Sequence, residues 1–187
     1  MNDLRIETDR LVIRQFKLSD LEDFHNYRKD PEVAKFQGYE PFDQNEARVF
    51  ILDHADKSFG EPGEWTQYAI EHTDSKTVLG DCAIKLALED QRLGEVGITI
   101  SPAHQQKGYA REALTAILDF LFGREDFHRV TETVDAENAA SIKLVESVGF
   151  RKEGHFIENI FFNGKWGSEM QYAMLRNEWI AKTRKSN

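Results

Sequence analysis

The hydrophobic period of the sequence changes abruptly between residues 92 and 121. Up to residue 101 apolar and polar residues alternate as in a strand, whereas from Ala110 the apolar residues recur at helical spacing. The helical set is Ala110, Ala113, Leu114, Ile117, Leu118 and Leu121. A short polar loop joins the two patterns and has Gly108 just before the helix. A strand that enters a helix this way leaves free backbone amides beside the positive end of the helix dipole, which favours binding of a pyrophosphate.

The loop pattern at this junction is Gln-x-x-Gly-x-Ala, beginning at Gln105. A glycine lets a ligand approach the backbone closely, although an ordinary glycine-containing loop at a helix start has the same pattern. Two other nucleotide-binding patterns, Gly-x-x-x-x-Gly-Lys-Ser/Thr and Gly-x-Gly-x-x-Gly, do not occur. The sequence therefore lacks the main motif that would predict a kinase or a dinucleotide-dependent dehydrogenase.

The remaining segments predict an α/β fold with a mixed sheet and flanking helices. We expect a first strand over 4–16, helices capped by Ser19 and Asp43, and an antiparallel meander over 65–71, 78–87 and 92–101. After the long helix we expect a strand over 129–135 and a helix from Asn138 that stops at Gly149. Two further strands, 150–162 and 167–175, are joined by the hairpin signal Asn163-Gly164.

Charge limits the partners. The chain has 33 acidic and 24 basic residues, a net charge of −9, which disfavours nonspecific nucleic-acid binding. Ten acidic and four basic residues lie between Asp53 and Glu95, as a solvated surface or as a funnel for a cationic substrate. The single cysteine, Cys82, lies in an apolar run that predicts a buried strand thiol. We expect one domain over 1–187, in the cytoplasm and without membrane segment or metal.

A second motif follows about 30 residues after the first. It is Asn138-Ala-Ala-Ser-Ile-Lys-Leu-Val-Glu-Ser-Val-Gly-Phe150. Together the two motifs resemble the Gcn5-related N-acetyltransferase (GNAT) superfamily, over roughly residues 5–175. The opening Glu7-Thr-Asp-Arg-Leu-Val-Ile-Arg14, the Leu18-Ser-Asp20 that follows and Gly154 resemble the branch that contains ribosomal-protein alanine N-acetyltransferases. The resemblance implies a mostly antiparallel sheet of about seven strands, splayed open by acetyl-CoA.

The resemblance also implies which residues bind the cofactor. Strand backbone would hold the pantetheine arm and loop amides the pyrophosphate, from Ile98, Thr99, Ile100, Gln105, Gln106, Lys107, Gly108, Tyr109, Ala110 and Arg111. Asn138 would hydrogen-bond the pantetheine chain, or would only cap its own helix. The side chains of Lys107 and Arg111 lie near the CoA phosphates or are simply solvated.

For catalysis the resemblance implies direct attack of an amine on the thioester in a ternary complex. A backbone N–H near Ile100 would polarise the carbonyl, and a carboxylate would take the amine proton. Many family members have a tyrosine acid seven residues after the asparagine and some a glutamate five residues before it, where this chain has Val145 and Thr133. We therefore select Ser141 as the acid and Glu95 as the base, and Asp135 and Glu132 are weaker candidates for the base. Solvated or structural roles remain open for all of them.

The predicted function is acetyl-CoA-dependent N-acetylation of a primary amine. The acceptor is a protein N-terminus or a small cation such as a polyamine or an aminoglycoside, and the acidic composition suits all of these. Because the tyrosine and the glutamate are missing, the alternative is a CoA-binding sensor without catalysis. We expect a monomer or a homodimer.

Overall fold

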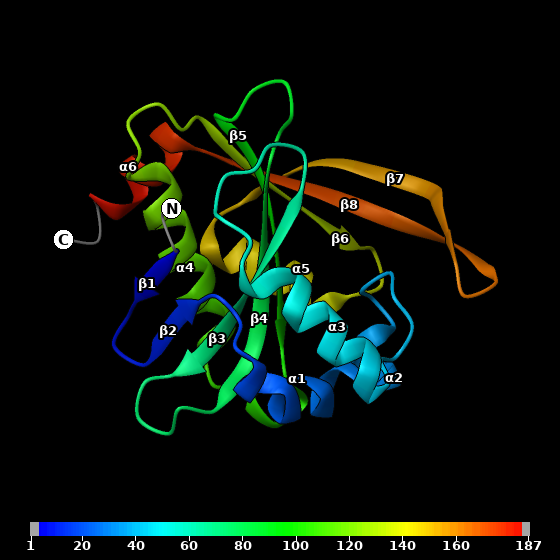
Figure 1. Cartoon of the computed structure of the whole chain (residues 1–187). Coiled ribbons are helices and arrows are strands. Elements are labelled where there is room, and N and C mark those ends of the chain that lie inside the picture. Colours follow the sequence, from blue (N-terminus) through cyan, green and yellow to red (C-terminus); the bar gives the residue numbers. More distant parts are fainter. Residues whose placement is uncertain (1–3, 185–187) are drawn as a thin grey trace.

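The protein is built on one mixed β-sheet, seen in a computed structural model that describes residues 4–184 (Figure 1). Within these residues the strands are β1 Arg5–Glu7, β2 Leu11–Arg14, β3 Trp65–His72, β4 Val78–Leu86, β5 Leu93–Ile100, β6 Arg129–Asp135, β7 Arg151–Phe162 and β8 Lys165–Leu175. Their order is β1-β2-β3-β4-β5-β6-β8-β7. Neighbours are antiparallel except β5 and β6. A parallel pair needs a long crossover, which residues 101–128 provide.

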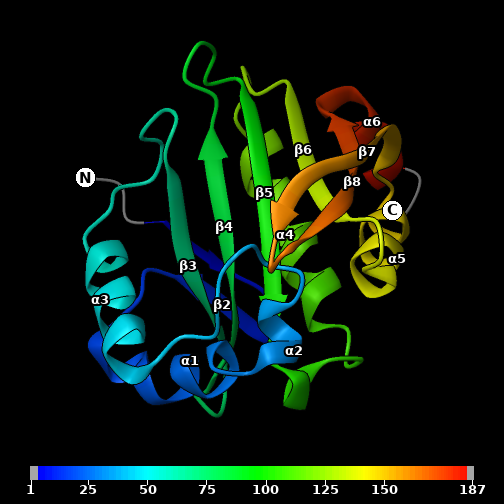
Figure 2. The same cartoon turned by 90° about the vertical axis from the view of Figure 1, so that its right-hand side faces the viewer.

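Helices cover both faces of the sheet. They are α1 Leu21–Arg28, α2 Pro31–Ala34, α3 Gln44–Ala55, α4 Tyr109–Phe122, α5 Ala139–Val148 and α6 Arg176–Thr183, with short 3-10 turns at Leu18–Asp20 and Pro102–His104. Helices α1 to α3 lie on the face turned to the viewer in Figure 2, which we call the front face, and α4 lies behind the sheet. Helices α4, α5 and α6 share one apolar cluster with the sheet on this rear face.

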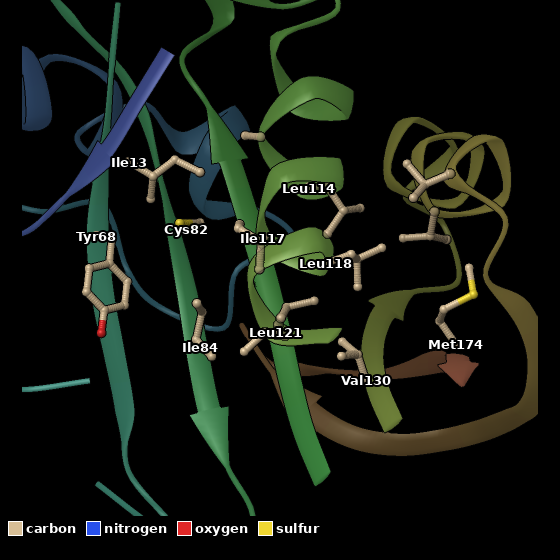
Figure 3. Close-up of a cluster of buried hydrophobic side chains, with 14 of the residues drawn as sticks. Ile13, Tyr68, Cys82, Ile84, Leu114, Ile117, Leu118, Leu121, Val130 and Met174 are labelled. Carbon is tan, nitrogen blue, oxygen red and sulfur yellow. The ribbon is translucent and has the colours of Figure 1, made fainter. Parts of the chain in front are cut away.

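Helix α4 forms the centre of the rear core. Its apolar stripe is buried against side chains of the sheet, among them Ile84 of β4 and Val130 of β6 (Figure 3). Burying one such Leu or Ile side chain stabilises a fold by about 1.5–3 kcal/mol. Because this stripe holds α4 firmly, the first turn of the helix has a fixed position beside the end of β5. Cys82 lies in the same core as predicted, and burial raises the pKa of its thiol well above the usual value.

Most of the expected elements are confirmed. Strands β3, β4 and β5 form the antiparallel meander, and β6, α5, β7 and β8 lie where the pattern predicts them. Asp43 caps α3 by accepting a hydrogen bond from the Glu46 N–H, and Gly149 ends α5 in a left-handed conformation. The hairpin turn Asn163-Gly164 has the two positive φ angles, 50° and 73°, that a type I′ turn requires.

The N-terminal expectations are partly wrong. Residues 4–16 form two strands instead of one, because the chain reverses after Glu7 and the Thr8 N–H donates to the Leu11 carbonyl. The sheet therefore has eight strands in the described residues instead of about seven. Ser19 caps no helix, since it lies inside the 3-10 turn that precedes α1. Helices α2 and α6 are not anticipated by the sequence pattern.

The β7–β8 hairpin extends away from the body of the molecule (Figure 1). It exposes large apolar side chains at Phe156, Ile157, Ile160, Phe161 and Trp166. The aromatic Trp166 packs edge-on against Phe161 on this hairpin, with 5.3 Å between ring centroids. Among residues 4–184, none of the helices has the length and apolarity to cross a membrane. The same residues contain no cluster of metal-binding side chains.

Candidate active site

The sheet opens between its two parallel strands. Strand β6 pairs with β5 only from Leu93 to Glu95, although β4 follows β5 as far as Ile100. Beyond Glu95 the β6-facing edge of β5 has no strand partner in the described chain. Backbone groups between Val96 and Ile100 are thereby free to bind an extended ligand, since a strand edge is a row of donors and acceptors. The predicted residues Ile98 and Thr99 lie in this open stretch.

The loop between β5 and α4 lies at the open end of this gap. Gln106 and Gly108 both have positive φ angles, 59° and 84°, and α4 begins at Tyr109. No side chain caps this helix start, so the amides of its first turn point out of the helix without an intrahelical partner. The Gln105 side chain is used locally, because its Nε2 donates to the Ile100 carbonyl at 3.0 Å. It closes the strand end, and only its backbone remains for a ligand.

Sequence reasoning missed Arg10, a third cation at this loop. Its guanidinium donates to the Lys107 carbonyl at 3.1 Å and lies 4.5 Å from the centre of the Tyr109 ring. Its Nε also donates to Glu112 of α4 at 2.7 Å. The signal was present in the Thr-Asp-Arg-Leu segment, but only the fold brings the turn between β1 and β2 to α4. A hollow of about 540 Å³ lies beside this contact and is lined by Gly108 and Arg111, among others.

The start of α5 borders the gap from the other strand. Asn138 caps the helix, since its Oδ1 accepts a hydrogen bond from the Ser141 N–H at 3.1 Å. The cap leaves the amino group of the Asn138 side chain as a donor for a ligand. Ser141 is half-buried in the first turn. Val145 is fully buried in the rear core, so the apolar side chain at the family's tyrosine position packs inside the protein.

Three rows of side chains cross the front face beside the gap: Ala69–Asp81–Thr99, Gln67–Ala83–Gly97 and Trp65–Lys85–Glu95. Helix α1 covers the first row, where Arg28 and Tyr27 both donate to the carboxylate of Asp81. In the middle row, Ala83 has only a methyl side chain and Gly97 has none. A Cβ placed on Gly97 would meet no heavy atom within 4 Å. This small hollow lies directly beside the unpaired edge of β5.

Side chains with hydrogen-bond acceptors lie in the middle row and in the row next to it. Glu95 is held by two front-face groups: the Lys85 ammonium at 2.9 Å and the Thr133 hydroxyl, which donates at 3.2 Å. Its side chain is 27% exposed, so it is neither locked in the core nor fully solvated. In the middle row, the buried Gln67 Oε1 has no hydrogen-bond partner within residues 4–184. Of these acceptors, the partly exposed carboxylate of Glu95 is the one that suits a donor such as an amine.

Glu132 lies on the other side of the sheet from Glu95. It follows Thr131, the last residue of β6 that pairs with β5, and it is 3% exposed. Its neighbours in the strand alternation, Val130 and Val134, belong to the rear core, so its side chain projects to the rear. Burial, with the nearby charge of Glu95 as a smaller cause, raises the pKa of Glu132 to about 8. The carboxyl group is therefore mostly protonated at neutral pH.

The other sequence candidates have structural partners. Asp135 accepts a hydrogen bond from the Glu137 N–H at 2.7 Å and so closes the turn before α5. The Lys107 ammonium donates to the Ala103 carbonyl at 2.9 Å, within its own loop. Arg111 is exposed on α4. Arg111 and Arg10 both lie beside the loop, where Arg10 is paired with Glu112.

These features fit a CoA molecule. An unpaired strand edge suits the amides of a pantetheine arm, and free amides next to Gly108 suit a pyrophosphate. Three basic side chains, Arg10, Lys107 and Arg111, lie close to these amides, and basic side chains are the usual partners of phosphates. A mixed sheet opened in this way, with free helix-start amides at its open end and a carboxylate at its closed end, is the arrangement expected of a transferase that uses a CoA-linked donor.

Comparison with known proteins agrees with this class. Residues 10–151 match the family model described as "Acetyltransferase (GNAT) domain". The chain therefore belongs to the GNAT family and is an N-acetyltransferase.

Its relatives cover nearly the whole chain. The uncharacterized N-acetyltransferase YnaD of Bacillus subtilis is 30% identical over 94% of this chain and 99% of its own length. A spermidine N(1)-acetyltransferase of Vibrio cholerae is 26% identical over 93% and 98%. The crystal structure of a GNAT-family acetyltransferase from Bacillus anthracis has a TM-score of 0.85 at 27% identity, over 94% and 100%. A Vibrio cholerae spermidine N-acetyltransferase with CoA and spermine has a TM-score of 0.75 at 24% identity, over 92% and 99%.

Proposed function

We propose that this enzyme transfers the acetyl group of acetyl-CoA directly to a primary amine of a small polycationic molecule, with polyamines as the first choice. The observation that supports this most is the open middle row of the front face. There Ala83 has a small side chain and Gly97 has none, which leaves space at the edge of β5 beside Glu95.

Acetyl-CoA would enter from the loop end of the gap. The amides from Gln106 to Arg111 would bind the pyrophosphate, and the edge of β5 at Ile98, Thr99 and Ile100 would bind the pantetheine arm. The arm then runs back along β5 toward the closed end, so the thioester comes to lie near Gly97. A backbone N–H of the unpaired edge would stabilise the negative charge that develops on the carbonyl oxygen. Asn138 would donate to the arm from the side of α5.

Glu95 would be the general base. It lies at the closed end of the gap on the front face. An amine bound in the middle row would attack the thioester from this side. The family's glutamate five residues before Asn138 is Thr133 here, and the Thr133 hydroxyl bonds to Glu95. In this chain the carboxylate would therefore come from β5, the strand next to β6, at the same end of the gap. Glu95, or a water that it holds, would take the proton of the amine.

Ser141 would act on the leaving group. It lies in the first turn of α5, at the border of the gap, where its hydroxyl would donate a hydrogen bond to the sulfur of CoA. This interaction would orient the thiol and would stabilise part of its developing charge.

A small amine is preferred over a protein N-terminus for two reasons. Spermidine acetyltransferases are among the relatives that cover nearly the whole chain, above 25% identity. The segment from 53 to 95, which provides strands β3 and β4 of the front face, is strongly acidic. A molecule with several ammonium groups gains more from such a field than a single α-amine does.

An acceptor panel tests the function. Thiol release from acetyl-CoA is measured with spermidine and spermine, with aminoglycosides and with N-terminal peptides beginning in alanine or serine. We expect kcat/KM to be at least about tenfold higher for polyamines than for any peptide, which corresponds to about 1.4 kcal/mol of selectivity. Higher activity on peptides would reject the polyamine assignment. Tight acetyl-CoA binding without turnover on any amine would instead identify a CoA-binding sensor.

A further inference from the structure

Glu132 is a buried carboxyl group to which the proposed function gives no role. Its Oε2 has no hydrogen-bond partner in the described part of the chain, and the residue is 3% exposed. Burying a polar group without a partner costs about 1–3 kcal/mol. An apolar residue between Val130 and Val134 would avoid that cost. A buried carboxyl group that lowers stability and has an oxygen without a hydrogen-bond partner is therefore a candidate for a role in the reaction.

The position of Glu132 at the gap supplies one. Strands β5 and β6 separate after the pair Glu95–Thr131, and Glu132 is the next residue of β6. Glu95 projects to the front face at this point, where Lys85 and Thr133 hold it. Glu132 projects to the rear, into the cluster that also contains Val145 of α5. The two carboxyl groups therefore flank the closed end of the gap from opposite faces of the sheet.

Acetyl transfer has a second proton to account for. When the C–S bond breaks, the sulfur becomes a thiolate that needs a proton, and Val145 stands where related enzymes have a tyrosine acid. The hydroxyl of Ser141 can hydrogen-bond the sulfur, but an aliphatic alcohol is a far weaker acid than a thiol. A stronger acid beside the gap would supply this proton more readily.

We propose that Glu132 is this acid: its protonated carboxyl group donates the proton to the sulfur of CoA as the thiol leaves. Glu95 on the front face and Glu132 on the rear face then form a base and acid pair with the thioester between them. The assignment rests on the proposed function in taking acetyl-CoA as the donor, but it does not depend on which amine accepts the acetyl group.

The electrostatic surroundings support the protonated form. Burial raises the pKa of Glu132 to about 8, close to the value of about 8.5 for an ordinary thiol, so the proton transfer is nearly balanced. Glu95 on β5 acts on it electrostatically, and Tyr172 on β8 is its cross-strand partner, whose hydroxyl donates a hydrogen bond to Glu146 on α5. The α4 side chains in this cluster are apolar. Pairs of catalytic acids and bases are typically found where the surroundings give two carboxyl groups different pKa values.

The atoms balance as follows. An ammonium substrate loses one proton through Glu95, and the free amine forms a bond from its nitrogen to the thioester carbon. The C–S bond breaks with its electron pair on sulfur, while the O–H bond of Glu132 breaks and an S–H bond forms. Glu95 takes the second nitrogen proton. Once the products leave, Glu95 gives the second nitrogen proton to water and Glu132 takes one proton from water, so that one proton is released overall and nothing is oxidised or reduced.

The test compares Glu132→Gln with the control Glu137→Gln, which neutralises an exposed carboxylate in the turn between β6 and α5. Thiol release is measured with spermidine and with hydroxylamine, a small nucleophile that needs no polyamine site, after subtraction of the uncatalysed rate. We expect Glu132→Gln to lower kcat about 100-fold or more with both acceptors. The KM for acetyl-CoA should change less than about threefold, and the fall in kcat above pH 8 should disappear. The control should behave as wild type.

A readout without substrate checks the carboxyl group itself. The raised pKa favours the folded state below about pH 4.5, and this contribution is lost as the pH rises to about 8. The Tm of Glu132→Gln relative to wild type should therefore increase between pH 4.5 and 8. The variant Glu132→Met, of similar size, should melt higher than wild type at pH 8 and still be slow.

The outcomes separate the two proposals. Turnover of Glu132→Gln within threefold of wild type would overturn the acid role, as would loss of folding or of CoA binding in both variants, which would mean a structural role. A Glu132-dependent reaction with hydroxylamine but none with polyamines would reject the proposed acceptor and keep Glu132. No thiol release with any nucleophile would reject both.

Discussion

At the scale of single residues, Thr133 explains how the chain can lack a glutamate at that position and still have a carboxylate at the gap. Its hydroxyl holds Glu95 at 3.2 Å, and Lys85 holds the other oxygen at 2.9 Å. A pair of charges that is about one-third exposed contributes little to stability. We therefore infer that the contacts with Thr133 and Lys85 serve to orient the Glu95 carboxylate toward the open middle row.

The base role of Glu95 makes a direct prediction. Glu95→Gln should lower kcat with polyamines about 100-fold, because the amide cannot take the amine proton, whereas the Tm should change by only a few degrees. Steady-state kinetics and a thermal melt measure the two effects. Glu89→Gln, which changes an exposed carboxylate in the turn before β5, serves as the control. If both variants turn over alike, Glu95 is a surface residue.

At the scale of elements, the active site depends on the junction of β5 and α4. Helix α4 is fixed by its buried stripe, and the short loop before it has two positive φ angles, at Gln106 and Gly108. The turn between β1 and β2 is tied to the same helix, since the Thr8 hydroxyl and Arg10 both donate to Glu112. Elements more than 90 residues apart in sequence thus meet at the turn that we propose binds the pyrophosphate.

The junction can be tested with two glycines of similar conformation. Gly108→Val and Gly164→Val each place a branched residue at a positive φ, 84° and 73°, and each should cost about 1–2 kcal/mol of stability. Only the first should weaken CoA binding, by about tenfold or more, because its side chain fills the space between the loop amides and a pyrophosphate. Calorimetric titration with CoA gives the affinities. Equal affinities in the two variants would remove the pyrophosphate from this loop.

At the scale of the whole molecule, two electrostatic fields of opposite sign coexist. The net charge of −9 favours cations, whereas three basic side chains, Arg10, Lys107 and Arg111, gather at the loop between β5 and α4, although Arg10 is paired with Glu112. The cofactor is an anion and the proposed acceptor a polycation. Each would therefore have to be attracted by the part of the surface that it binds.

Salt separates the local field from the global one. Raising the ionic strength from about 0.01 M to about 0.1 M shortens the Debye length from about 30 Å to about 10 Å. If local charges govern binding, KM should rise for spermidine and for acetyl-CoA alike. A KM for acetyl-CoA that falls with salt would show that the global negative charge dominates at the loop. Initial rates at fixed pH, with choline chloride as the salt, provide the measurement.

Local patterns in the sequence were sufficient for much of this. The amphipathic stripe of α4, the cap of α5 at Asn138 and the Asn163-Gly164 turn depend on residues a few positions apart, so their chemistry can be read directly from the chain. The cofactor loop and its family resemblance follow from the same short-range signals. The sequence also supplied Glu95 and Glu132 as candidates, but not the faces to which they project.

Tertiary structure alone decided the rest. The front row of Gln67, Ala83 and Gly97 exists because three strands pair in one register, and a shift by one residue would turn each of them to the opposite face. Pairing of β6 with β5 stops after Thr131, which opens the sheet, and the strand alternation turns Glu132 to the face opposite Glu95. Arg10 reaches the loop only because β1 and β2 pack at the far edge beside α4. Such contacts join residues far apart in the chain, and their geometry is determined by how the whole core packs.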